Sequence, residues 1–62
     1  MTYSRALLQA KRRARETGEF RYIVREPEEG YQVADEFDLD TFFLGATPVT
    51  CIGPDGLEYD SH

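Results

Sequence analysis

The sequence contains a single cysteine and a single histidine, and both scarcities limit its chemistry. Cys51 cannot form an internal disulfide, so a disulfide-stabilised secreted domain is not expected. His62 stands at the last position, where a Ser-His-Asp or Cys-His arrangement would lack a firmly held base. We therefore expect no enzymatic activity, and we interpret Cys51 as a small buried residue between Thr50 and Ile52.

Long apolar runs are also absent. The longest candidate, residues 42–44, is far shorter than the ~20 residues that a membrane-spanning helix needs. The N-terminus shows no basic stretch followed by an apolar one, so we expect a cytoplasmic protein with no membrane contact. A chain of 62 residues is expected to form one domain of marginal stability. A chain this short is typical of bacterial or phage proteins. Because small domains often gain stability by self-association, a homodimer stays open as an alternative.

Positive charge is missing from more than half of the chain. All seven Lys and Arg residues lie at or before Arg25, whereas ten of the twelve acids follow it. Residues 1–25 therefore carry seven positive and two negative charges, a sum of +5, and residues 26–62 sum to −10. A domain this small must bring the two halves together. The net charge of −5 disfavours general binding to a phosphate backbone.

Apolar residues recur at helical spacing near the N-terminus and predict a helix over residues 3–17. Thr2 is a typical N-cap, and Gly18 stands where a residue with left-handed conformation ends a helix. The apolar positions of this face are Tyr3, Ala6, Leu7, Ala10 and Ala14.

Four segments have the aromatic and β-branched composition of strands. Turn sequences at residues 26–30 and 53–56 join them into two hairpins, because each turn combines a proline that fixes φ with a glycine that adopts positive φ readily. The expected strands are residues 20–25, 31–34, 48–52 and 57–59.

The segment between the two hairpins does not follow the two-residue period of a strand. We favour a short helical turn over residues 38–44, with Asp35 as a cap and Gly45 at its end. A single shared core then predicts an α+β fold of two layers, in which the N-terminal helix packs on a small antiparallel sheet of three to four strands.

Acidic and aromatic residues are mixed in residues 35–43, which form the first candidate site. Carboxylates around an exposed aromatic ring are typical of a protein-binding hot spot, and a compact acidic surface suits a basic groove on a partner. Most of the phenylalanines here are expected in the core, because the chain has few other large apolar residues. The predicted partner-binding residues are Asp35, Glu36, Phe37, Asp38, Asp40, Phe42 and Phe43.

The same acids do not form a calcium-loop pattern. Phe42 and Phe43 follow Asp38 and Asp40 where oxygen ligands should stand, and no glutamate closes the loop. The turn at residues 53–56 also lacks the Lys-Ser/Thr ending of a phosphate-binding loop. We therefore expect no metal site and no cofactor.

The second candidate site is the basic stretch of the N-terminal helix. Clustered guanidinium groups bind phosphates, whereas the simpler interpretation is a solvated face that pairs with acids elsewhere in the chain. Leu8 falls in this basic arc, either as a lone exposed leucine or as the apolar centre of a contact patch. The alternative nucleic-acid-binding residues are Leu8, Lys11, Arg12, Arg13 and Arg15.

These observations favour a small non-enzymatic protein-interaction module that presents residues 35–43 to a protein partner, for example to a basic groove. Nucleic-acid binding through the helix is the first alternative, which the net negative charge disfavours. A structural module that serves only to form a homodimer is the second.

Overall fold

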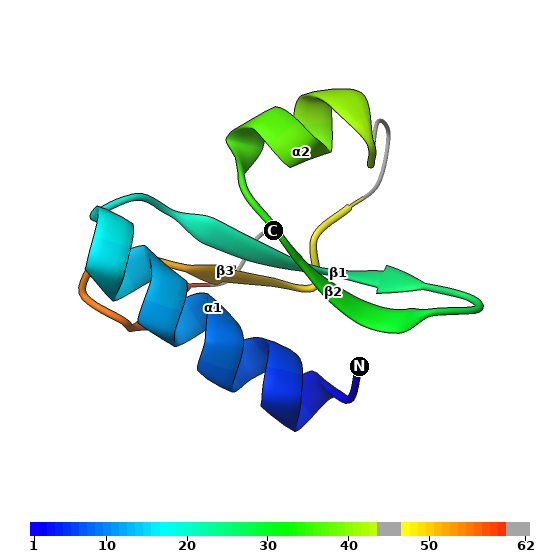
Figure 1. The fold of residues 1–62 in the computed structure, drawn as a ribbon, viewed down its shortest axis with the longest axis horizontal. Helices are drawn as coiled ribbons and strands as arrows, with labels where there is room; N and C mark the ends of the chain where they lie inside the picture. The colour runs from blue at the N-terminus through cyan, green and yellow to red at the C-terminus, as the bar shows by residue number, and fades with distance from the viewer. Residues whose placement is uncertain (44–46, 60–62) are drawn as a thin grey trace.

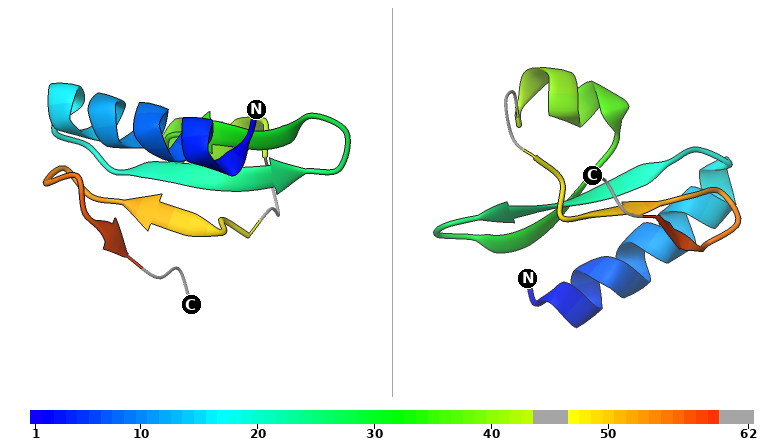
Figure 2. Two further views of the ribbon diagram at one scale, coloured as in Figure 1. Left: turned by 90° about the horizontal axis from the view of Figure 1, so that it is seen from below. Right: turned by 180° about the vertical axis from the view of Figure 1, so that it is seen from behind.

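The computed structural model describes residues 1–43 and 47–59. These residues form the helices and strands α1 (Tyr3–Thr17), β1 (Arg21–Glu26), β2 (Gly30–Ala34), α2 (Glu36–Thr41), β3 (Thr50–Ile52) and β4 (Glu58–Tyr59). The strands build one antiparallel sheet in the order β2-β1-β3-β4. Helix α1 lies across one face of this sheet, as Figures 1 and 2 show. The predicted α+β fold, with an N-terminal helix on a small antiparallel sheet, is confirmed.

Helix α1 has the bounds and the caps that the sequence predicts. The Thr2 hydroxyl accepts a hydrogen bond from the Arg5 backbone N–H at 3.3 Å. Gly18 ends the helix with φ of 72° and donates its N–H to the Ala14 carbonyl at 2.8 Å. Three alanines, Ala6, Ala10 and Ala14, are fully buried. Their small side chains let the helix backbone approach the sheet closely.

Strand β1 is the centre of the sheet, because it pairs with β2 on one side and with β3 on the other. The register places Ile23 opposite Val33 of β2 and opposite Thr50 of β3. Ile23 and its neighbour Val24 point to opposite faces, and both are buried. The chain thus leaves β2 at one edge, passes through α2, and returns on the other side of β1 (Figure 1).

The core lies between α1 and the sheet. Ile23 and Ile52 pack against the three buried alanines of the helix. Tyr3 lies at one end of this layer. Its hydroxyl oxygen is 2.6 Å from the Thr50 hydroxyl oxygen, and its ring packs edge-on against the Tyr31 ring with 5.2 Å between the ring centroids. The helix is therefore fixed to the sheet by packing along its length and by a part-buried hydrogen bond near its start.

The second hairpin is shorter than predicted, but its turn is as expected. Gly56 has φ of 82°, and the Gly53 N–H donates to the Leu57 carbonyl at 3.0 Å. Strand β3 begins at Thr50 rather than at residue 48, and β4 contains only Glu58 and Tyr59. Pro48 has no N–H to donate to a strand ladder, and the Val49 N–H donates to the Ile23 carbonyl at 2.8 Å just before β3 begins.

Helix α2 begins at Glu36, two residues earlier than predicted, because Asp35 is its N-cap. The Asp35 carboxylate accepts from the Asp38 N–H at 2.8 Å, and the Asp38 carboxylate accepts from the Asp35 N–H at 3.3 Å. This reciprocal pair is a capping box. Helix α2 ends at Thr41, with Phe42 as its C-cap, so the predicted extension of the helical turn through residues 42 and 43 was wrong. The last predicted positions, residues 44 and 45, lie outside the described residues. In Figures 1 and 2, α2 lies to one side of the two main layers.

Candidate functional site

Two phenylalanines of the α2 segment are exposed, and not in the core as expected. Phe37 is 67% exposed and Phe42 is 77% exposed, while Phe43 is half-buried. None of the six residues of α2 is buried. The expectation failed because the core between α1 and the sheet is already filled by alanine and isoleucine side chains, and α2 lies outside that layer.

The four acids of the predicted site separate into two roles. Asp35 and Asp38 face each other in the capping box, so their carboxylates are occupied by backbone N–H groups. Glu36 and Asp40 are exposed, and Glu36 accepts a long hydrogen bond of 3.4 Å from the Tyr22 hydroxyl. Burial raises the pKa of the Tyr22 phenol, and the negative charge of Glu36 raises it further. Glu36 and Asp40 are therefore the carboxylates available to a partner.

The register of the first hairpin adds residues that the sequence analysis missed. Tyr22 and Ala34 form the last pair of the β1–β2 ladder. Phe20 lies two residues before Tyr22 and Glu36 two residues after Ala34, so the two residues leave the sheet at the same end. They line a shallow pocket of about 320 Å³ with Gly18 and Glu19. Only the pairing of β1 with β2 could have indicated this contact, because sixteen positions separate the two residues.

Exposed rings and carboxylates thus occur both on the α2 segment and just before β1, and Glu36 and Phe20 link the two parts through their shared pocket. The Phe20 ring is exposed and lies 6.2 Å from the Tyr59 ring, centroid to centroid. We call this region the acidic–aromatic surface. It consists of Glu19, Phe20, Glu36, Phe37, Asp40 and Phe42.

Cys51 is half-buried, so its interpretation as a buried core residue was wrong. The register places it opposite Tyr22 and Tyr59, on the face of the sheet that points away from α1. Its neighbours Thr50 and Ile52 alternate to the helix side and are buried. Burial and the nearby Glu36 carboxylate raise the pKa of the Cys51 thiol, which favours the less nucleophilic thiol form.

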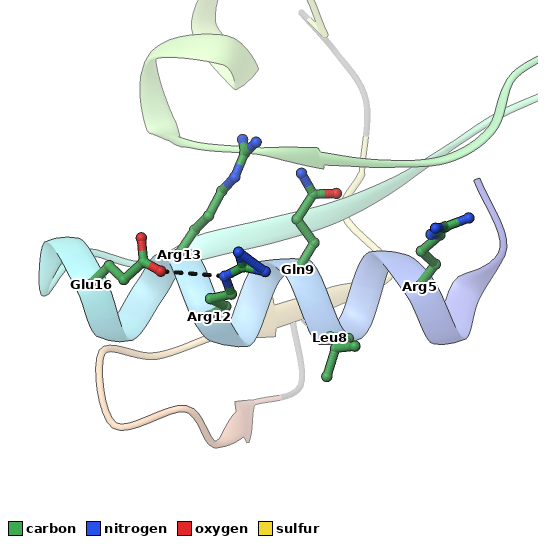
Figure 3. Close-up of a pocket in the computed structure, with 6 residues that line it drawn as sticks. All are labelled: Arg5, Leu8, Gln9, Arg12, Arg13 and Glu16. Carbon is green, nitrogen blue, oxygen red and sulfur yellow. Dashed lines mark hydrogen bonds and ion pairs between the residues drawn. The ribbon is translucent and has the colours of Figure 1, made fainter.

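The outer face of α1 carries a second feature, a shallow hollow of about 510 Å³ (Figure 3). Leu8 is 71% exposed at this face. Of the predicted nucleic-acid set, Arg12 and Arg13 lie here with Leu8, whereas Lys11 and Arg15 do not line the hollow. The Arg15 guanidinium instead lies against Gly56 of the β3–β4 turn. The residues around the hollow, which we call the basic face, are Arg5, Leu8, Gln9, Arg12, Arg13 and Glu16.

The basic half and the acidic half of the chain do not neutralise each other through ion pairs in the part of the chain that the structure describes. Arg12 lies 3.4 Å from Glu16, one helical turn away, and Arg21 lies 3.9 Å from Glu19. Both pairs join residues of the first half. Within residues 1–43 and 47–59, no ion pair at contact distance joins a helix arginine to an acid of the second half. Arg15 nevertheless lies near enough to Asp55 for its charge to help lower the pKa of that carboxyl, after the hydrogen bonds from Leu57 and Tyr59.

Other kinds of site find no support in the described segments. No three His, Cys, Asp or Glu side chains of these segments are grouped as ligands for a metal ion. None of their helices has the length and apolar character needed to cross a bilayer. The fold and the two charged faces define a small α+β domain with one helix on a four-stranded antiparallel sheet. No protein-family model, curated protein or solved structure matches this chain.

Proposed function

We propose that this protein is a non-enzymatic interaction module whose acidic–aromatic surface binds a basic segment of a protein partner. The observation that carries the proposal is that Phe37 and Phe42 are exposed on the same short segment as the exposed carboxylates of Glu36 and Asp40. Exposed aromatic residues within a charged rim are the usual composition of a protein-binding hot spot.

The rings and the acids contribute differently to such binding. An exposed ion pair contributes only about 0.2–1 kcal/mol, whereas truncation of a hot-spot aromatic residue costs about 2 kcal/mol or more. Phe37 and Phe42 therefore set most of the affinity. Glu36 and Asp40 attract a basic partner, orient it and speed its association.

The pocket beside α2 suits one cationic side chain of the partner. Glu19 and Glu36 supply carboxylates on its wall, and the Phe20 ring supplies a face for a Lys or Arg group. The capping box of Asp35 and Asp38 fixes the first turn of α2 before binding, which reduces the entropy lost when the partner docks.

The test is a fluorescence-anisotropy titration with a labelled helical peptide that carries Lys on one face and Leu on the other. We expect binding to the wild type and at least about tenfold weaker binding to the Phe37→Ser/Phe42→Ser variant. The Glu36→Gln/Asp40→Asn variant should slow association and reduce the salt dependence. Asp35 and Asp38 are left unchanged, because their loss would disturb the helix itself.

Matched controls are a peptide with Glu in place of Lys and the variant Glu28→Gln/Glu29→Gln. Both glutamates are exposed in the β1–β2 turn, away from the proposed surface. Equal binding of the Lys and Glu peptides would contradict the proposal. So would a Glu28→Gln/Glu29→Gln variant that loses as much binding as the Glu36→Gln/Asp40→Asn variant.

Nucleic-acid binding through α1 has weaker support. Three arginines line the hollow of the basic face, but Glu16 shares it, and Lys11 and Arg15 lie outside it. The net charge of −5 also opposes the counterion release that drives such binding.

A further inference from the structure

We propose that the basic face of α1 binds the acidic–aromatic surface of a second copy of this chain, so that the protein self-associates through α1–α2 contacts. The inference rests on the proposed function, because it assigns an occupant to the same surface. It also gives a role to the hollow around Leu8, which the proposed function leaves unused.

The first argument is charge complementarity. The basic face presents the guanidinium groups of Arg5, Arg12 and Arg13 (Figure 3). The only one of them in an ion pair of the described segments is Arg12, and the two side chains of that pair are 77% and 64% exposed. The acidic–aromatic surface presents Glu36 and Asp40, and the sequence places no Lys or Arg after Arg25. The basic face contains one acid, Glu16, which pairs with Arg12, so this face keeps an excess of positive charge where the other surface has an excess of negative charge.

The second argument is that both faces expose apolar side chains at their centres. Leu8 stands among the arginines with most of its surface in water. The hollow beside it has a volume of about 510 Å³, which is large enough to receive a phenyl ring. Phe37 and Phe42 are rings of this kind on α2. A ring placed there would contact Leu8 and the flat faces of the Arg5 and Arg12 guanidinium groups, a geometry that cation–π attraction favours.

The third argument is that every copy carries both faces. Helices α1 and α2 occupy different parts of the molecule (Figure 1), so one copy can use its α1 and its α2 at the same time. A two-fold pair then makes the α1–α2 contact twice, which doubles the buried surface for one loss of rotational and translational freedom. Domains of this size often gain stability by such association.

The experiment is sedimentation equilibrium of the full chain from about 10 µM to about 1 mM, at about 50 mM and about 500 mM NaCl. We expect the average mass to rise with concentration toward twice the monomer mass at low salt, and the association to weaken at least about tenfold at high salt. Phe42→Ser and Leu8→Ser should each weaken association by about tenfold or more.

Charge reversal provides the sharper test. Arg12→Glu and Asp40→Lys should each be monomeric alone, because each puts like charges in contact. An equimolar mixture should associate again, because the altered face of one variant then meets the altered face of the other. Matched controls are Lys11→Glu on the same helix and Glu28→Lys in the β1–β2 turn, both of which should associate like the wild type. Circular dichroism establishes that each variant is folded.

A wild type that stays monomeric at every concentration overturns the inference. So does association that survives Arg12→Glu and Asp40→Lys, or that the control variants abolish equally. If the wild type is monomeric and binds a mixed-sequence RNA, and the Arg12→Glu variant does not bind that RNA, then the basic face binds nucleic acid and not a second copy. Peptide binding by a monomeric wild type, lost on Phe37→Ser/Phe42→Ser, would leave the proposed function standing without this inference.

Discussion

Helix α1 and helix α2 are held in place by different physical means. Helix α1 buries three alanines against Ile23 and Ile52 and has a cap at each end. Helix α2 buries none of its residues and depends on the capping box of Asp35 and Asp38. The comparison shows that aromatic content alone does not predict a core. Phe37 and Phe42 of the aromatic-rich segment face water, whereas the alanine face of α1 lies in the core.

The largest expected effect comes from replacing leucine by aspartate at one of two adjacent positions of α1, in two separate variants. Leu7→Asp places a charge against the core cluster, which should cost several kcal/mol and unfold a domain of this size. Leu8→Asp, at a position that is 71% exposed, should change the free energy of unfolding by less than about 1 kcal/mol. Urea denaturation followed by circular dichroism measures both. Equal destabilisation would show that the α1 faces are not assigned correctly.

The next prediction compares a core aliphatic residue with an exposed ring. Ile23→Ala should destabilise the domain by about 2–5 kcal/mol, because Ile23 is fully buried between α1 and the sheet. Phe42→Ala should change stability by less than about 0.5 kcal/mol, since the ring is mostly in water. Thermal unfolding of the two variants provides the measurement, recorded at low protein concentration and high salt, so that self-association does not contribute to stability. A large loss on Phe42→Ala would place that ring in a core.

A smaller and more local effect is expected at the cap of α2. Asp35→Ala removes the acceptor of the Asp38 N–H, and loss of such a cap costs about 1 kcal/mol. Because α2 lies outside the main layers, the effect should be confined to it. Amide hydrogen exchange should quicken in residues 36–41 and stay unchanged in α1. Uniform quickening in both helices would mean that α2 is coupled to the core.

The smallest effect concerns pH and the β3–β4 turn. The Leu57 N–H at 3.0 Å and the Tyr59 hydroxyl at 2.7 Å donate to the Asp55 carboxylate and lower its pKa. The unfolded chain therefore takes up the proton first, near the usual Asp pKa of about 3.9. Stability is fully present above that pH and falls as the pH drops through the lower folded pKa. Asp55→Asn should flatten this acid dependence in thermal melts recorded below about pH 5.

Local sequence patterns predicted α1 and both hairpins, because the cap at Thr2, the glycine at residue 18 and the Pro-Gly turns each act within a few residues. The same local chemistry placed a helical segment after Asp35, although its start was two residues too late. The predicted site residues Glu36, Phe37, Asp40 and Phe42 lie on the exposed surface that the structure shows. Their binding role stays a prediction.

The remaining features required contacts between residues far apart in the sequence. The register of β1 with β2 brought Phe20 and Glu36 into one pocket, and the turn sequence predicted the hairpin without fixing that register. The exposure of Phe37 and Phe42 depended on whether other side chains had already filled the core, which is a property of the whole packing. The sequence by itself thus determined the elements and the separation of charge. Only the tertiary structure decided which side chains face water, because burial depends on what the rest of the chain places beside each residue.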